Sequence, residues 1–299
     1  MKIERGVQWS AVRGCIHGVE GIGKTTFAAQ WPNPVILDTE DGSHQIDCAR
    51  VRCPDWATLE GALHDLVRDA QGFQTVVVDS ADWMETHLKD HVCAKAGKQS
   101  IEQFAYGKGF VHVTEAVARV LGIADKLVAA GVHFLFVAHT QVRRTSPPDE
   151  TEGYDRYELK LSKHTAPLIR EWCDLMLFAN YRVKLVEGGD GRMKARGGKE
   201  RVMYAERSAA WDAKNRFGLP AEMPMDVASI AHIFASPSKR PGLRDRIAAA
   251  KTIEELGAIG DLVDDMASKS KLTPEQVAAL EAAIAAKHEQ LEPAEAAHG

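Results

Sequence analysis

The first 235 residues alternate short apolar runs with longer amphipathic stretches, which is the pattern of an α/β fold. The run Thr75–Val78 contains only Thr and Val, and such a β-branched run is typical of a strand covered on both faces. The short runs predict strands at Val12–His17, Val35–Leu37, Thr75–Val78, Val132–Ala138, Asn180–Val186 and Arg201–Ala205. The longer stretches predict helices at Lys24–Trp31, Trp56–Ala70, Val111–Ala130 and Thr165–Phe178. We therefore expect a mostly parallel sheet flanked by helices.

The chain changes in composition near residue 235. The segment Ala235–Gly242 is rich in Pro, Ser and basic residues, which is typical of a linker. Beyond it the chain is rich in Ala, Glu and Lys, and the pairs Thr252/Glu255 and Thr273/Gln276 have the spacing of helix capping boxes. The expected organisation is a core over residues 1–235, a linker over residues 236–242 and a small C-terminal helical appendage over residues 243–299, with a frayed tail from Glu292 to Gly299.

Charge and cysteine content narrow the function only a little. The formal net charge of -5 argues against a protein that coats DNA with its whole surface. Between Gln141 and Arg216, however, 16 Lys and Arg outnumber 12 Asp and Glu, which hints at a local basic face. The cysteines form no zinc spacing and predict reduced thiols. No apolar run reaches the roughly 18 residues of a membrane span, and the N-terminus lacks a signal peptide, so we expect a cytoplasmic protein without a membrane partner.

The segment Gly18–Thr25 has the P-loop spacing Gly-x-x-x-x-Gly-Lys-Thr, between a predicted strand and a predicted helix. Its glycines let backbone N–H groups turn toward phosphate oxygens, Lys24 reaches the β- and γ-phosphates of ATP, and Thr25 offers a hydroxyl to Mg²⁺. The alternative is a coincidental glycine turn. The predicted nucleotide-binding residues are Gly18, Glu20, Gly21, Gly23, Lys24, Thr25 and Thr26.

Two carboxylates follow predicted strands and are candidates for the chemistry. Asp79 ends a Val-Val-Val-Asp run, a Walker B pattern, and would hold Mg²⁺ beside the P-loop. Alternatively, Asp79 caps a helix that begins near Ser80. Glu40, just past Val35–Leu37, is the best candidate for a base that orients the attacking water. The alternative for Glu40 is a helix-capping or solvated carboxylate.

Four motifs in this order resemble those of RecA-type recombinases. They are Gly18–Thr25 with Glu20 in its third position, Asp38-Thr-Glu40, Val77-Val-Asp-Ser80 and Thr140-Gln-Val142. The resemblance implies a RecA-like core in which Glu40 is the catalytic base. It also implies that Gln141 senses the γ-phosphate and leads into a DNA-binding loop. His139 could face the same site or be a core-edge histidine.

The segment Ala213-Lys-Asn-Arg-Phe-Gly218 resembles the Lys-x-Arg motif of DnaB-type helicases and KaiC. In those proteins the two cations reach across a subunit interface to a neighbour's γ-phosphate. The resemblance implies that Lys214 and Arg216 act in trans, in a homo-oligomer with ATP at its subunit interfaces. The alternative is a solvated basic turn.

Two segments are candidates for contacts with DNA. Tyr106 and Lys108 lie in a glycine-flanked stretch after the Walker B motif, and Arg143, Arg144 and Arg156 follow the predicted sensor Gln141. Aromatic side chains stack on bases, and cations follow the phosphates of a single strand. The alternative for each residue is an ordinary polar surface loop.

Over Val12–Pro220 the chain resembles phage single-strand annealing ATPases with a RecA-like core, a group also known as phage nucleotide-binding proteins or AAA-type P-loop ATPases. The resemblance implies ATP-dependent binding and annealing of single-stranded DNA in phage homologous recombination. It further implies DNA-stimulated hydrolysis, a host single-strand DNA-binding protein as partner, and the bacterial host cytoplasm. The alternative is a nucleotide switch that loads or recruits replication proteins and hydrolyses ATP slowly, while a small-molecule kinase ranks last.

Overall fold

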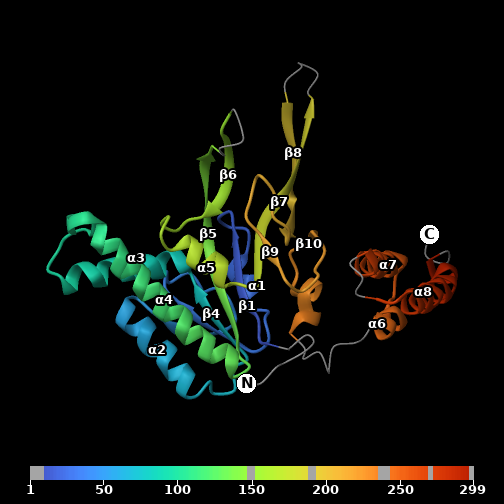
Figure 1. The fold of residues 1–299 in the computed structure, drawn as a ribbon, viewed down its shortest axis with the longest axis horizontal. Helices are drawn as coiled ribbons and strands as arrows, with labels where there is room; N and C mark the ends of the chain where they lie inside the picture. The colour runs from blue at the N-terminus through green and yellow to red at the C-terminus, as the bar shows by residue number, and fades with distance from the viewer. Residues whose placement is uncertain (1–9, 147–151, 188–192, 235–242, 269–271, 296–299) are drawn as a thin grey trace. The chain divides into compact units, whose positions relative to one another are not determined.

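The computed structural model describes residues 10–146, 152–187, 193–234, 243–268 and 272–295 (Figure 1). The chain divides into two compact units, one ending at Phe234 and one beginning at Ala235. Each unit has its own hydrophobic core, so each is described by itself. Among the described residues, no helix is long and apolar enough to cross a membrane.

The first unit is built on one large sheet with the strand order β10-β8-β7-β1-β5-β4-β2-β3. The strands β7, β1, β5, β4, β2 and β3 run parallel to their neighbours, whereas β8 and β10 add an antiparallel edge. Two short strands lie off this path, with β6 paired to β5 and β9 paired to β7. The strands are β1 Arg13–Gly18, β2 Pro34–Asp38, β3 Ala49–Arg52, β4 Thr75–Asp79, β5 His133–Thr145, β6 Tyr154–Leu159, β7 Leu175–Glu187, β8 Met193–Tyr204, β9 Lys214–Asn215 and β10 Glu222–Pro224.

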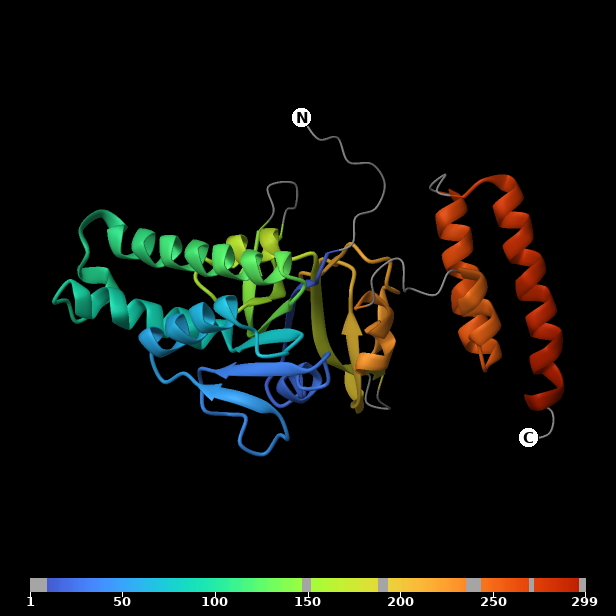
Figure 2. The ribbon, with the colours of Figure 1, turned by 90° about the horizontal axis from the view of Figure 1, so that it is seen from below.

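Helices cover both faces of this sheet (Figures 1 and 2). Because side chains alternate along a strand, Val76 and Val78 of β4 pack in the core with the larger helices, whereas Val77 packs on the opposite face. Helices α2, α3, α4 and α5 bury their apolar positions on the first face, and α1 and η3 cover the second. The helices are α1 Lys24–Ala28, α2 Trp56–Arg68, α3 Ala81–Lys95, η1 Ile101–Gln103, η2 Ala105–Gly107, α4 Lys108–Ala129, α5 Ala166–Trp172 and η3 Val227–Ile233.

The second unit contains the helices α6 Leu243–Ala249, α7 Ile253–Ser268 and α8 Pro274–Glu295. Both predicted capping boxes form. The N–H of Glu255 donates to the Thr252 hydroxyl at 3.1 Å, and the N–H of Gln276 donates to the Thr273 hydroxyl at 3.3 Å. The tail predicted to fray from Glu292 is instead helical as far as Glu295. The predicted linker, residues 236–242, and residues 296–299 lie outside the described residues.

The α/β class, the mostly parallel sheet and the C-terminal helices are confirmed, but several predicted boundaries are wrong. The strand predicted over Arg201–Ala205 begins at Met193, and the helix predicted over Lys24–Trp31 ends at Ala28. The helix predicted over Thr165–Phe178 ends at Trp172, and the apolar residues from Leu175 onward form β7 beside β1. A short apolar run suits a buried helix and a buried strand equally well, so periodicity does not separate them. The strand predicted to end at Ala138 continues to Thr145, because β6 pairs with its extension.

Candidate functional site

The carboxyl ends of four parallel strands meet at one edge of the sheet. In the strand register Gly18 at the end of β1 lies opposite His139 on β5, and Asp38 at the end of β2 lies opposite Asp79 at the end of β4. Ligands of open α/β sheets bind at this kind of edge. The sheet therefore brings the predicted P-loop, Asp79 and the turn that carries Glu40 to one place.

The P-loop runs from the end of β1 into α1. Gly21 and Gly23 have φ values of 70° and 98°, the left-handed region in which glycine is favoured. A Cβ atom on Gly18 would lie only 2.2 Å from the carbonyl oxygen of Ala179 on β7. The glycines of the motif are therefore required by the backbone path and by the close approach of β7.

Lys24 lies beneath the loop and is buried, with 6% of its surface exposed. Its Nζ donates to the carbonyl oxygens of Gly18 at 3.1 Å and Val19 at 3.0 Å. Burial lowers the pKa of Lys24, and the nearby carboxylates of Asp79, Asp82 and Glu40 partly oppose that effect. Phosphate oxygens are better acceptors than these carbonyls, so Lys24 is placed to exchange them for a bound phosphate.

Asp79 has a buried carboxylate in which one oxygen atom lacks a hydrogen-bond partner among the described residues. Only 4% of the residue is exposed, and its Oδ1 has no hydrogen-bond partner among the described residues. Burial raises the pKa of Asp79 to about 6, although a hydrogen bond from Thr25 opposes the shift. A buried polar atom without a partner points to a missing ligand.

The chemistry of Thr25 and Asp79 fits Mg²⁺. This ion takes oxygen ligands, and beside a nucleotide it is held by one or two protein groups together with phosphate oxygens and water. No cluster of three or more His, Cys, Asp or Glu able to hold a metal occurs among the residues that the structure describes. Thr25 and Asp79 would hold Mg²⁺ together with the nucleotide's own oxygens. Mg²⁺ held there would neutralise charge on the phosphates.

Asp38 shapes the turn that presents Glu40. Its carboxylate accepts hydrogen bonds from the N–H groups of Glu40 at 3.3 Å, Gly42 at 3.2 Å and Ser43 at 3.0 Å, and from the Ser43 hydroxyl at 2.5 Å. Burial of Asp38 acts to raise its pKa, but these hydrogen bonds outweigh it and hold the pKa below its usual value. Asp38 is therefore an organising residue of this turn, and the role of Glu40 as the base stays a prediction.

Glu40 lies in a group with His139 and Asp82. Nδ1 of His139 is 3.9 Å from Oε2 of Glu40 and 2.9 Å from Oδ2 of Asp82. Burial raises the pKa of Glu40, and His139 partly offsets the rise. The hydrogen bond to Asp82 raises the pKa of His139, although burial opposes it. A partly buried carboxylate with a raised pKa is suited to accept a proton from water.

Two members of this group were not firmly predicted from the sequence. The sequence leaves His139 open between the site and the core edge, and the structure places it beside Glu40. The sequence motifs do not include Asp82, which lies three residues past Asp79 in the first turn of α3. The possible helix start at Ser80 was the signal that could have placed Asp82 at this edge.

Gln141 lies on β5 two residues beyond His139, where the strand begins to pair with β6. Its Nε2 donates to the carbonyl oxygen of Leu159 on β6 at 3.0 Å. In this arrangement the amide links the two strands of the hairpin. The γ-phosphate-sensing role of Gln141 stays a prediction.

Lys214 and Arg216 are bonded within their own subunit, away from its P-loop. Nζ of Lys214 donates to the carbonyl oxygens of Arg170 at 3.3 Å and Glu171 at 2.9 Å, in the last turn of α5. Arg216 forms an ion pair with Asp174 at 2.7 Å, although 59% of its side chain is exposed. A role in trans concerns a second subunit and stays a prediction.

The candidate DNA contacts differ in exposure. Tyr106, in the connection between α3 and α4, is 99% exposed, and Lys108 at the start of α4 is also exposed. Arg143 is half-buried and Arg144 is exposed, both on the extension of β5. The prediction that Arg156 contacts DNA is wrong. Arg156 is only 7% exposed and forms an ion pair with Asp212 at 2.7 Å, so its side chain is not available to bind DNA.

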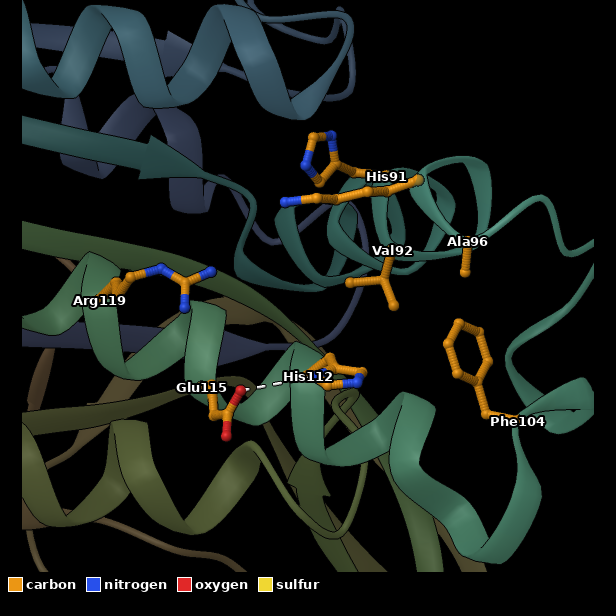
Figure 3. Close-up of a pocket in the computed structure, with 8 residues that line it drawn as sticks. His91, Val92, Ala96, Phe104, His112, Glu115 and Arg119 are labelled. Atoms are coloured by element: carbon orange, nitrogen blue, oxygen red, sulfur yellow. Dashed lines mark ion pairs between the residues drawn. The ribbon is translucent and has the colours of Figure 1, made fainter.

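A pocket of about 330 Å³ lies elsewhere, between α3 and α4 (Figure 3). Phe104 and the α3 residue Val92 form part of its apolar wall, and His112 and Glu115 of α4 face each other at 3.5 Å. None of the predicted nucleotide-binding or catalytic residues lines it. The pocket is therefore separate from the P-loop edge.

Comparison with known proteins gives one family. A family model described as an AAA domain matches residues 10–217, which span the P-loop, the Glu40 turn, Asp79, Gln141 and Arg216. The match ends before the C-terminal helical unit. No curated protein is significantly similar to the chain.

Proposed function

The chain belongs to the AAA domain family, whose model covers residues 10–217, and we propose that it is an ATPase that binds and anneals single-stranded DNA in phage homologous recombination. In the proposed reaction, water attacks the γ-phosphate, Glu40 accepts the proton of that water, and ADP leaves. Lys24 holds the phosphates, and Thr25 with Asp79 would hold Mg²⁺.

The observation that carries the nucleotide site is the buried Oδ1 of Asp79, which has no hydrogen-bond partner within the described part of the chain. It lies at the strand edge next to the P-loop, and its carboxylate accepts a hydrogen bond from Thr25. A carboxylate desolvated in this way is costly unless a cation binds there. Glu40, partly buried in the turn that follows the adjacent strand β2, supplies a base at the same edge.

The DNA part of the proposal rests on β5 and on the motif order. β5 runs without interruption from His133 to Thr145, so it joins His139 at the nucleotide edge to Arg143 and Arg144 on the hairpin. Figure 1 shows the β5–β6 hairpin extending beyond the body of the sheet. Cations on such an extension can follow the phosphates of a single strand. The same strand would report that contact to the residues around Glu40.

The test is ATP turnover and oligonucleotide binding with and without single-stranded DNA. We expect DNA to stimulate turnover several-fold and complementary strands to anneal faster with ATP present. Replacing both Arg143 and Arg144 by Gln should weaken single-strand binding about tenfold and reduce the salt dependence by about one to two counterions. The matched control is Arg68→Gln, an exposed cation on α2. If single-stranded DNA changes neither ATP turnover nor nucleotide affinity, the proposal is contradicted.

A second candidate is a nucleotide switch that recruits replication proteins, such as a host single-strand DNA-binding protein, and hydrolyses ATP slowly. One observation favours it: Lys214 and Arg216, expected to accelerate hydrolysis in a homo-oligomer, are both bonded within their own subunit. For the switch we expect tight nucleotide binding, slow turnover that DNA does not change, and partner binding that depends on ATP. Fast DNA-stimulated turnover would exclude it.

A further inference from the structure

Two side chains of the β7–β8 hairpin contact the backbone of the P-loop. The hydroxyl of Tyr181 on β7 donates to the carbonyl oxygen of Gly21 at 3.3 Å. The guanidinium of Arg201 on β8 donates to the carbonyl oxygen of Ile22, also at 3.3 Å. Tyr181 and Arg201 are directly paired in the antiparallel register, so they project from the same face of the hairpin. Neither residue belongs to the P-loop motif or to the carboxylate group around Glu40.

The loop glycines leave the room that this contact needs. A Cβ atom on Gly23 would lie 2.8 Å from a guanidinium nitrogen of Arg201, and one on Gly18 would collide with β7 at Ala179. The hairpin therefore packs directly against the loop. Within the described residues Arg201 makes no ion pair, so its positive charge has no carboxylate partner there.

The hydrogen bonds to the P-loop carbonyls also affect the orientation of the P-loop N–H groups. A P-loop binds phosphate by turning backbone N–H groups toward the anion, and its carbonyls must then point elsewhere. In this chain Lys24 holds the carbonyls of Gly18 and Val19, and the hairpin holds those of Gly21 and Ile22. Fixing the carbonyls in advance removes conformational freedom that a bound nucleotide would otherwise have to remove.

We propose that Tyr181 and Arg201 are positioning residues through which the β7–β8 hairpin sets the nucleotide affinity of the P-loop. Tyr181 fixes the orientation of the Gly21 peptide. Arg201 fixes the next peptide and adds an unpaired positive charge beside the bound phosphates. This role is independent of DNA and goes beyond the annealing activity proposed above.

The test compares Tyr181→Phe and Arg201→Met with Arg182→Met. Arg182 is a matched control because it adjoins Tyr181 on β7 but pairs with Glu200 at 2.8 Å and with Glu222, not with the loop. Nucleotide Kd, steady-state kcat and KM, and Tm with and without Mg·ATP are measured on the full chain without DNA. We expect Arg201→Met to raise Kd and KM about tenfold, and Tyr181→Phe about threefold, with kcat changed less than about twofold. Arg201→Lys should recover part of the affinity, because it restores the charge without the planar guanidinium.

A merely structural role gives a different result. It lowers the Tm of the nucleotide-free protein but leaves Kd and the Mg·ATP-induced rise in Tm unchanged, and that outcome overturns the proposal. Equal Kd values for Arg201→Met and Arg182→Met also overturn it. Tyr181→Phe removes a single oxygen atom, so it keeps the test decisive if Arg201→Met does not fold. Because no DNA is present, a failed annealing activity leaves this result unaffected.

Discussion

The P-loop edge and the charge cluster between α5 and β9 both concentrate ionisable groups, yet they satisfy them differently. In the cluster, Asp212 binds Arg156 at 2.7 Å and Arg170 at 2.9 Å. Asp174 binds Arg13 and Arg216 there, and Lys214 is held by backbone carbonyls. At the P-loop edge, Asp79 has a buried oxygen without a partner among the residues that the structure describes, and Lys24 binds carbonyls that a phosphate can replace.

This difference separates a ligand site from an ion-pair network. The carboxylates of such a network already have cationic partners within the chain, and removing one partner would leave a buried charge uncompensated. Buried groups that stay unsatisfied carry a cost that binding a ligand removes. Charge density alone marks both regions. Among the described residues, the P-loop edge has a buried carboxylate oxygen without a partner, whereas the unpartnered atom of the cluster is Nε of Arg156, whose guanidinium already pairs with Asp212.

The largest expected effect belongs to Glu40. Glu40→Gln should lower turnover about a hundred- to ten-thousandfold while ATP affinity changes only a few-fold, because the base acts in the transition state. Single-turnover hydrolysis and nucleotide binding measure the two quantities. The control is Asp41→Asn, a neighbouring carboxylate that pairs with Arg52 at the surface. Normal turnover in Glu40→Gln would remove Glu40 as the base.

His17 connects the two regions and gives the next largest effect. It is fully buried, with Nδ1 3.1 Å from the Thr140 hydroxyl and Nε2 2.8 Å from the carbonyl oxygen of Asp212. The carbonyl can only accept, so Nε2 carries the proton and Nδ1 accepts from Thr140. Burial lowers the pKa of His17 from 6.5 to about 4, so the neutral ring is the folded form.

A lowered histidine pKa gives stability that is present above pH 6.5 and is lost as the pH falls toward 4. Over that window the wild type should lose on the order of 3 kcal/mol of unfolding free energy relative to His17→Asn. Denaturant unfolding at several pH values measures the difference in unfolding free energy between the wild type and His17→Asn. Other titrating groups, such as Asp79, are present in both proteins, so their contributions cancel in this difference. The control is His64→Asn, an exposed position on α2. Parallel pH profiles for wild type and His17→Asn would show that His17 does not carry this dependence.

The smallest expected effect belongs to Arg216. If its pairing with Asp174 is its main role, Arg216→Met should lower the unfolding free energy by about 0.5–1 kcal/mol, because the side chain is largely exposed. Turnover should then fall less than about threefold. Kinetics and unfolding of the same preparation give both numbers. A thousandfold loss of turnover at unchanged stability would instead establish action in trans and an oligomeric site.

The sequence predicted the P-loop edge well because its geometry is local. A strand followed by a glycine loop places Lys24 and Thr25, and a buried strand ending in a carboxylate places Asp79. Parallel neighbours then bring such strand ends together whatever the loops between them do. The convergence of Lys24, Asp79 and Glu40 follows from these few rules.

The features that the sequence did not predict depend on contacts between segments far apart in the chain. Arg156 looked like a surface cation, but Asp212, which is 56 residues away, buries it. Arg201 reaches Ile22 across 179 residues, and no local pattern encodes that contact. The residues from Leu175 to Phe178 resemble the end of a helix in the sequence, but their pairing with β1 makes them part of a strand. Tertiary partners decided each of these cases.

The carboxylates of Asp79 and Asp174 give the sharpest contrast. Oδ1 of Asp79 has no partner among the described residues and marks the ligand site, whereas the carboxylate of Asp174 is paired with Arg13 and Arg216 and does not. Isothermal titration of ATP over a range of Mg²⁺ concentrations tests this contrast with Asp79→Asn and Asp174→Asn side by side. We predict that Asp79→Asn loses at least about tenfold of the Mg²⁺-dependent gain in ATP affinity, whereas Asp174→Asn retains that gain. An Asp79→Asn protein with the Mg²⁺ dependence of the wild type would contradict a role of Asp79 in holding Mg²⁺.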